Sequence, residues 1–169
     1  SYTDKPYGRQ EIKNPSDGSV VCVPDSYDEY RDVSKLLNKE KKLIELVDAE
    51  LAEGRNSMIF AEYTASPEAC ISYRLKYVLM KHLNLSDNEV VVLDSSSPSA
   101  AERETWIHKK AAAGAKVFIT NPRCVETGLD LCFQFEGRVY NYPTLIFYQM
   151  GYNMFTIWQA SRLAYRLNQ

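Results

Sequence analysis

Residues 89–120 read EVVVLDSSSPSAAERETWIHKKAAAGAKVFIT, and they predict a strand, a helix and a second strand. The runs at 89–93 and 116–120 are short and continuously apolar, which is typical of strands that are buried on both faces. Between these runs, Ser99 and Glu102 have the spacing of a capping box that opens a helix. Strands of this kind in alternation with helices indicate an α/β fold with a mostly parallel sheet.

The same alternation continues on both sides of this stretch. Further strands are predicted at 57–62 and 144–148, and further helices at 38–53, 66–83 and 156–169. Residues 1–37 are polar and rich in turns, so we expect a lead-in segment with one short strand at 19–23 rather than a second domain. The stretch between Asp130 and Thr144 is expected to form a loop.

Length and composition favour one globular domain. The chain has 169 residues, of which 45% are hydrophobic and 25% are charged, and no apolar run is long enough to span a membrane. Its 20 Lys and Arg residues nearly balance its 22 Asp and Glu residues. Proteins that bind nucleic acid tightly on their own usually carry an excess of positive charge, so the composition argues against a strong, independent nucleic-acid-binding domain. Because the sequence begins with Ser1 rather than Met, we expect it to be a piece of a larger protein.

Several common kinds of site are not indicated. No pair of cysteines has the C-x-x-C spacing of a zinc site, so we expect free thiols in a reducing cytoplasm. His108 is interpreted as a surface residue of its helix, and Asp28 with Glu29 as a solvated acidic pair. The sequence contains no G-x-x-x-x-G-K-[ST] loop, no G-x-G-x-x-G and no G-x-S-x-G. An α/β fold that lacks its own phosphate-binding loop suggests half of a nucleotide site.

Two segments carry the chemistry that is present. On the last helix, Gln159, Arg162, Arg166 and Gln169 fall within a stripe of roughly 80°, apart from the apolar face. Arginines placed in this way suit a phosphate group, although the same side chains could simply solvate an exposed helix. After the strand at 116–120, small polar groups and a glycine follow at the edge where ligands bind parallel sheets. An ordinary strand-to-helix connection would also explain that loop.

In this order, the two segments resemble motifs V and VI of superfamily 2 helicases, in their remodeller-type branch. The positions that fit are Gly128, Leu129, Leu131, Gln159, Ala160, Arg166 and Gln169, and Asp130 matches the G-L-D of DEAD-box relatives. The stretch SMIFAEYT at 57–64 is similar to motif IV. The resemblance covers roughly residues 38–169.

The resemblance implies a RecA-like, three-layer domain that forms the C-terminal of two lobes. ATP with Mg²⁺ would be held mainly by the missing N-terminal lobe of the same parent chain, and this lobe would supply arginine fingers. Arg166 matches the second finger, whereas Gly128, Asp130 and Gln159 match positions near the nucleotide. The positions implied to meet the DNA backbone are Tyr63, Thr64, Thr120, Asn121 and Arg123. No contact with a membrane is implied.

The sequence departs from the family pattern at the first finger. The family usually has arginine where this chain has Leu163, and Arg162 stands one residue early. Either Arg162 takes over the role of the first finger, or the protein has a single finger. Two other interpretations stay open: a degenerate lobe that binds a partner or DNA without motor activity, and an unrelated α/β enzyme with a small-molecule pocket.

Overall fold

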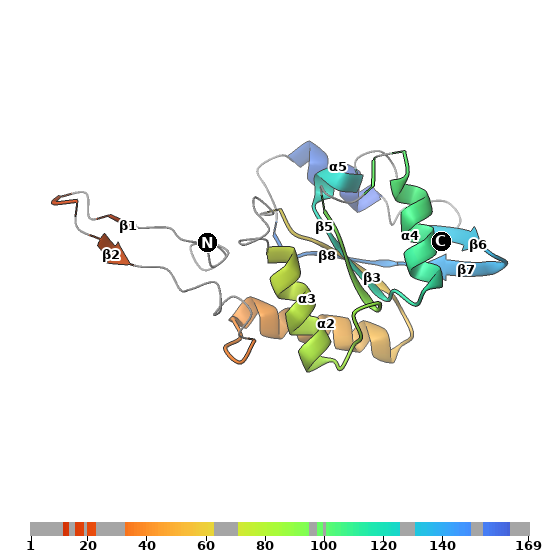
Figure 1. Cartoon of the computed structure of the whole chain (residues 1–169), viewed down its shortest axis with the longest axis horizontal. Helices are drawn as coiled ribbons and strands as arrows, with labels where there is room; N and C mark the ends of the chain where they lie inside the picture. Colours follow the sequence, from red (N-terminus) through yellow and green to blue (C-terminus); the bar gives the residue numbers. More distant parts are fainter. Residues whose placement is uncertain are drawn as a thin grey trace.

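The computed structural model describes residues 12–13, 16–18, 20–22, 33–62, 71–94, 98–99, 101–125, 131–149 and 154–162. Its centre is a four-stranded sheet in the order β4-β5-β3-β8 (Figure 1). The strands are β3 (Ser57–Phe60), β4 (Val90–Leu93), β5 (Val117–Thr120) and β8 (Thr144–Phe147). All three neighbouring pairs are parallel, and Ser57 is level with both Val117 and Thr144. The predicted parallel sheet is therefore confirmed.

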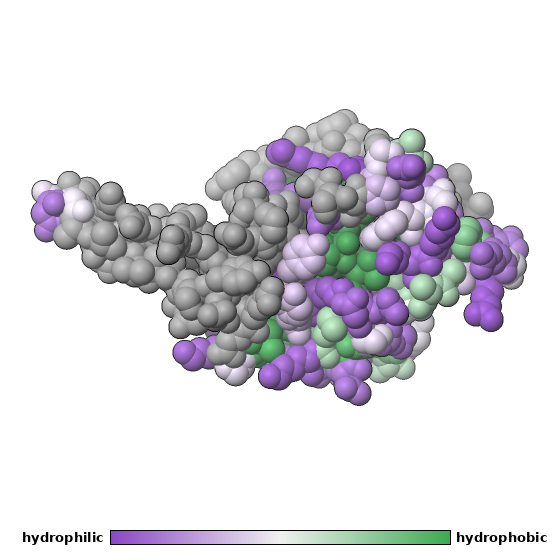
Figure 2. All heavy atoms as spheres, viewed as in Figure 1, coloured by the Kyte–Doolittle hydropathy of each residue, from purple (hydrophilic) through white to green (hydrophobic). Residues whose placement is uncertain are grey.

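Helices cover both faces of the sheet and create two cores. The helices α2 (Asn38–Ala52) and α3 (Ile71–His82) pack on one face, and α4 (Arg103–Ala112) and α5 (Met154–Ser161) pack on the other. Successive strand residues point to opposite faces, so Ile59 joins the core under α2 and α3, whereas Phe60 joins the core under α4. This arrangement is the expected three-layer fold. Figure 2 shows that apolar atoms on one face gather between α3 and α4, with hydrophilic side chains around them.

The predicted elements differ from the observed ones mainly at their ends. Helix α2 ends as expected, because Gly54 takes a φ of +72° that other residues avoid. The predicted start of α3 at Ser66 lies outside the described residues. Helix α4 begins at Arg103 rather than directly after Ser99. The Ser99 hydroxyl donates to the Glu102 carboxylate at 2.8 Å, and the Glu102 N–H donates to the Ser99 carbonyl at 2.9 Å. The two residues thus form a turn that precedes the helix.

The loop that we expected between Asp130 and Thr144 is instead a β-hairpin, so that prediction was wrong. Strands β6 (Cys132–Phe135) and β7 (Arg138–Asn141) pair antiparallel around a two-residue turn. Both turn residues have positive φ, +50° for Glu136 and +77° for Gly137, which matches the twist of a tight hairpin. Phe133 and Tyr140 stand opposite each other and their rings stack, so this pair holds the two strands together.

The lead-in segment contains the short strand that we predicted. Strand β2 (Val20–Cys22) pairs antiparallel with β1 (Ile12–Lys13). Near the end of the segment Val33 is buried, and its carbonyl oxygen lies 3.2 Å from the Nε2 atom of His82 on α3. The last part of the lead-in segment is therefore attached to the domain. None of the described helices has the length and apolar character that crossing a membrane requires.

Candidate functional site

The strand order places a topological switch point at the carboxyl edge of the sheet, between β3 and β5. The chain leaves β3 toward α3 on one face of the sheet. It leaves β5 through the short 3₁₀ helix η2 (Pro122–Val125) toward the hairpin and α5 on the other face. Adjacent parallel strands whose connections diverge in this way form the usual ligand site of open α/β sheets.

Asn121 joins the two strand ends at this switch point. Its Nδ2 atom donates to the carbonyl oxygen of Glu62, which follows β3, at 2.8 Å. Its Oδ1 atom accepts the backbone N–H of Arg123 at 2.9 Å. Both polar groups of the side chain are engaged within the protein. Asn121 therefore fixes the position of η2 relative to the end of β3.

The other residues predicted near Asn121 differ in exposure. Thr120 is fully buried, and its hydroxyl lies 3.3 Å from the carbonyl oxygen of Asn121. Arg123 is exposed, and it stands in the first turn after β5. Of these three residues, Arg123 offers its side chain to a ligand at the surface.

Polar side chains also follow β3, β4 and β8, as expected for the loops at this edge. The carboxylate of Asp94 accepts the hydroxyl of Tyr73 at 2.7 Å, and Gln149 is 4% exposed. The Oε2 atom of Glu62 is buried and has no hydrogen-bond partner among the described residues. From the sequence, Glu62 is only the last residue of the strand predicted at 57–62. Its place directly after a continuously apolar strand was the signal that could have marked it as a site residue.

Helix α5 brings a second group of side chains to the same edge. It packs against η2, and Ala160 anchors it in the core under α4. At its end, the exposed Arg162 places its guanidinium over the ring of Trp158, 4.5 Å from the ring centroid. Arg103 of α4 also reaches η2, where its Nη1 atom donates to the Cys124 carbonyl at 3.1 Å. The structure thus brings Asn121, Arg123 and the α5 residues to one edge.

Several predicted site residues fall outside the described part of the chain. These residues are Tyr63, Thr64, Gly128, Asp130 and Arg166, and so is Leu163 at the divergent finger position. Gln159 lies within α5, but the structure describes only its backbone and not its side chain. Their roles therefore stay predictions.

His108 is not the surface residue that we predicted. Its ring stacks on Phe133 of β6, with 3.9 Å between centroids, and Phe135 approaches it at 5.6 Å. The Nε2 atom is buried without a hydrogen-bond partner among the described residues. The hairpin causes this burial, and we had not predicted the hairpin. His108 is a packing residue between α4 and β6.

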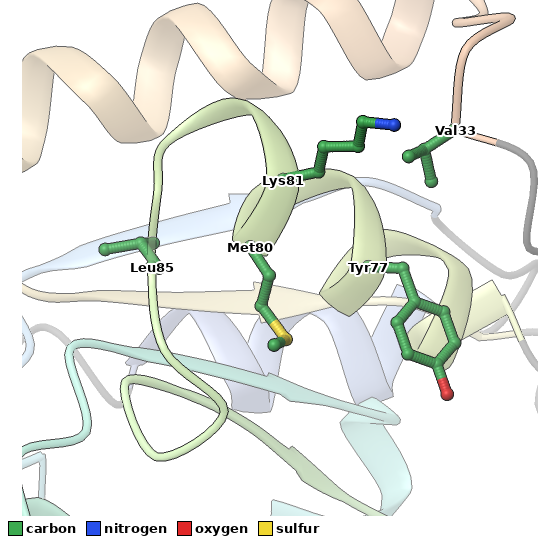
Figure 3. Close-up of a pocket in the computed structure, with 5 residues that line it drawn as sticks. All are labelled: Val33, Tyr77, Met80, Lys81 and Leu85. Atoms are coloured by element: carbon green, nitrogen blue, oxygen red, sulfur yellow. The ribbon is translucent and has the colours of Figure 1, made fainter.

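A hollow of about 480 Å³ opens beside the second half of α3 (Figure 3). Its lining residues are Val33, Tyr77, Met80, Lys81 and Leu85. Tyr77 and Met80 point to one side of the helix, whereas Lys81 points to the other (Figure 3). Because α3 starts at the carboxyl edge of the sheet, its second half lies toward the opposite edge. The hollow does not bring convergent polar groups to one ligand.

The cysteines and acidic residues of the described part form no metal centre. No group of three His, Cys, Asp or Glu residues there could hold an ion. Cys124 and Cys132 are free cysteines.

Comparison with known proteins supports the fold. No protein-family model matches the sequence, and no curated protein matches it. A solved structure described as the crystal structure of the C-terminal part of the Fun30 ATPase domain is similar, with a TM-score of 0.61 and 19% identity. The similarity covers 86% of this chain and 41% of that chain. This chain therefore spans less than half of that structure. The predicted RecA-like lobe is confirmed as a fold.

Proposed function

We propose that this chain is the second motor lobe of an ATP-dependent DNA helicase or translocase. One observation carries the proposal. The segment that resembles motif V follows β5, the segment that resembles motif VI begins in α5, and η2 and α5 pack against each other at the carboxyl edge. Two segments that are distant in sequence thus meet where this class of fold binds its ligands. The similarity to part of an ATPase domain supports the same conclusion.

In this proposal, the lobe supplies charge to a nucleotide that another lobe holds. Arg166 is the principal arginine finger, and its guanidinium would stabilise charge on the transferring phosphoryl group. Arg162 is the second candidate, and it would have to leave the ring of Trp158 to reach a phosphate. Gly128, Asp130 and Gln159 would lie near the nucleotide. The exposed cations at this edge suit a triphosphate, and we assign the carboxylates that bind Mg²⁺ to the first lobe.

The same edge would meet the DNA backbone. We assign this contact to Tyr63, Thr64, Thr120, Asn121 and Arg123, of which Arg123 is exposed in the structure. Contacts to phosphates position a protein on DNA without reading its sequence. A lobe that binds DNA together with a partner lobe needs few cations of its own, which agrees with a net charge of −2.

The proposal is tested in a protein that joins this lobe to its first lobe. Arg166→Ala should lower the kcat of ATP hydrolysis about 10³-fold or more, as expected when a finger is removed. Arg162→Ala, measured in parallel, shows whether that residue acts as a second finger. Lys42→Ala is the matched control, because it removes an exposed cation on α2, and its turnover should be unchanged. Near-normal turnover with Arg166→Ala would contradict the proposal.

A second candidate function is a lobe that binds a partner or DNA without powering movement. Leu163 in place of the usual arginine favours it, and so does the engagement of Arg162 with Trp158. If neither arginine variant changes ATP turnover while DNA binding persists, this second candidate is the better description.

A further inference from the structure

We infer that the exposed surface around Trp158 on α5 binds unpaired nucleotides of a nucleic acid strand. The inference rests on the proposed function and specifies the kind of nucleic acid at this point of the lobe. Trp158 is 53% exposed, although tryptophan is usually largely buried. The other exposed large hydrophobic residues of the described part are Leu46 and Val139, which are aliphatic. Trp158 thus supplies an aromatic ring that a base can stack on.

Arg162 organises this surface. Its guanidinium carbon lies over the indole of Trp158 at 4.5 Å from the centroid, which is a cation–π contact. This contact restricts the orientation of the indole, which lowers the entropy that ordering the ring on binding would lose. It also places a permanent positive charge beside the ring. A nucleotide offers the matching pair of groups, a flat base and a phosphate.

Further cations lie on the elements next to α5. Helix α5 packs against η2, which carries the exposed Arg123. Arg103 donates to the Cys124 carbonyl of η2, and its Nε atom is buried with no hydrogen-bond partner among the described residues. Three arginines from three elements therefore lie at or next to η2 and α5. This positive charge is complementary to a phosphodiester backbone, in a chain whose overall charge is slightly negative.

Stacking on an exposed indole distinguishes single strands from duplexes. In a duplex, neighbouring base pairs cover both faces of each base, so a protein at the backbone meets only sugars and phosphates. An unpaired base can place one face on the ring of Trp158, and every base can do so because each has a π-face. We therefore expect a preference for single strands with little sequence selectivity. Two or three phosphate contacts would give a slope of log K against log salt of about −1.4 to −2.1.

Fluorescence can follow Trp158 directly. The chain contains two tryptophans, so Trp106→Phe leaves Trp158 as the only one. Trp106 packs near Phe118 in the core under α4, and phenylalanine keeps most of that contact. The 169-residue chain with this substitution is titrated at low salt with oligothymidylate, with a duplex of the same length, and with ATP. We expect the single strand to quench Trp158 and to bind at least about tenfold more tightly than the duplex, given the strength of base stacking.

Two substitutions at position 158 separate stacking from a general structural effect. In the chain that retains Trp106, Trp158→Ala should weaken single-strand binding about tenfold or more, measured by anisotropy of a labelled oligonucleotide. Trp158→Phe keeps a ring and should retain most of the affinity. Val139→Ala is the control, because it shortens an exposed apolar side chain on β7, and its binding should equal that of the unmodified chain. Thermal unfolding establishes that each variant is folded.

Three results would overturn the inference. The first is equal affinity for single strand and duplex, and the second is equal binding by the alanine and phenylalanine variants. The third is quenching of Trp158 by ATP as strong as that by the oligonucleotide, because the ring would then belong to a nucleotide site. All of these measurements are made without the first lobe and without hydrolysis. A failure of this inference can therefore be told apart from a failure of the proposed function, which would appear as normal ATP turnover by Arg166→Ala.

Discussion

Arg74 on α3 is the largest fully buried side chain of the described residues, and its charge is compensated within the core. Its Nε atom donates to the Oε1 atom of Glu40 on α2 at 2.8 Å. Its Nη2 atom donates to the carbonyl oxygen of Lys35 at 2.9 Å. Glu40 in turn accepts the backbone N–H of Leu37 at 2.9 Å. One buried ion pair thus connects α2, α3 and the end of the lead-in segment.

Removing one charge of this ion pair should lower the free energy of unfolding more than removing both charges together. Arg74→Met leaves the carboxylate of Glu40 buried without a cation, and should lower the free energy of unfolding by about 3–5 kcal/mol. The double variant Glu40→Leu with Arg74→Met removes both charges, and should lose less stability than the single variant. Urea denaturation at pH 7 measures both changes. A double variant as unstable as the sum of the two single variants would contradict this account.

Single buried contacts of this kind could not be predicted from the sequence. Arg74 and Glu40 are 34 residues apart, and each stands in a helix where a charged residue usually faces solvent. His108 shows the same limit, because its stacking depends on Phe133 of a hairpin that we did not predict. Periodicity shows which face of a helix is buried, but not which polar side chains find partners there. Asn121, by contrast, could be placed at the site from its position directly after β5.

At the scale of elements, prediction succeeded where the signal was local. The strands of the central sheet are continuous apolar runs, and their observed limits lie within two residues of the predicted ones. The hairpin β6–β7 was missed even though Glu136 and Gly137 lie between alternating aromatic and polar residues. Two residues that both take positive φ between two such runs are a hairpin signal. Helix α5 begins at Met154, two residues before the predicted start.

Two carboxylates at the amino edge of the sheet should make the free energy of unfolding fall at acidic pH. Hydrogen bonds from Arg55, and then from Thr144 on β8, lower the pKa of Glu50 from its ordinary 4.5 to about 2. The ammonium of Lys116, together with Ser86, lowers the pKa of Glu89 to about 2 in the same way. A carboxyl group with a lowered folded-state pKa stabilises the fold above its unfolded pKa, and this contribution disappears as the pH falls toward the folded value.

We therefore expect the free energy of unfolding to fall between about pH 5 and pH 2, by on the order of 1–2 kcal/mol for each of the two groups. Urea denaturation at pH 7, 4.5 and 3 measures this slope. Glu50→Gln should lower the stability at pH 7 and flatten the slope. Glu45→Gln is the control, because the ion pair of Glu45 with Lys42 is exposed to solvent, and its slope should match that of the unmodified chain. An unchanged slope in Glu50→Gln would contradict the role of Glu50.

At the scale of the whole molecule, the strand order decides where a ligand can bind. The sequence predicted four parallel strands and the loops at their carboxyl ends, but not that β3 and β5 are neighbours. That pairing separates sequential strands and sends their connections to opposite faces of the sheet. The contact between Asn121 and the Glu62 carbonyl exists only because of this order. Long-range pairing depends on the packing of all layers together, so local patterns do not determine it.

The proposed division of labour between two lobes predicts how this chain behaves alone. The sequence contains no phosphate-binding loop of the P-loop type, so no part of it matches the machinery that holds ATP and Mg²⁺ in such motors. An arginine finger stabilises a transition state that other groups have already assembled. We therefore expect the 169-residue chain with Mg²⁺ and ATP to release phosphate no faster than a protein-free blank. Attachment to a first lobe should raise the turnover of that lobe by about 10³-fold or more. Turnover of about 1 s⁻¹ by the chain alone, abolished by Arg166→Ala, would mean that this chain holds a complete site.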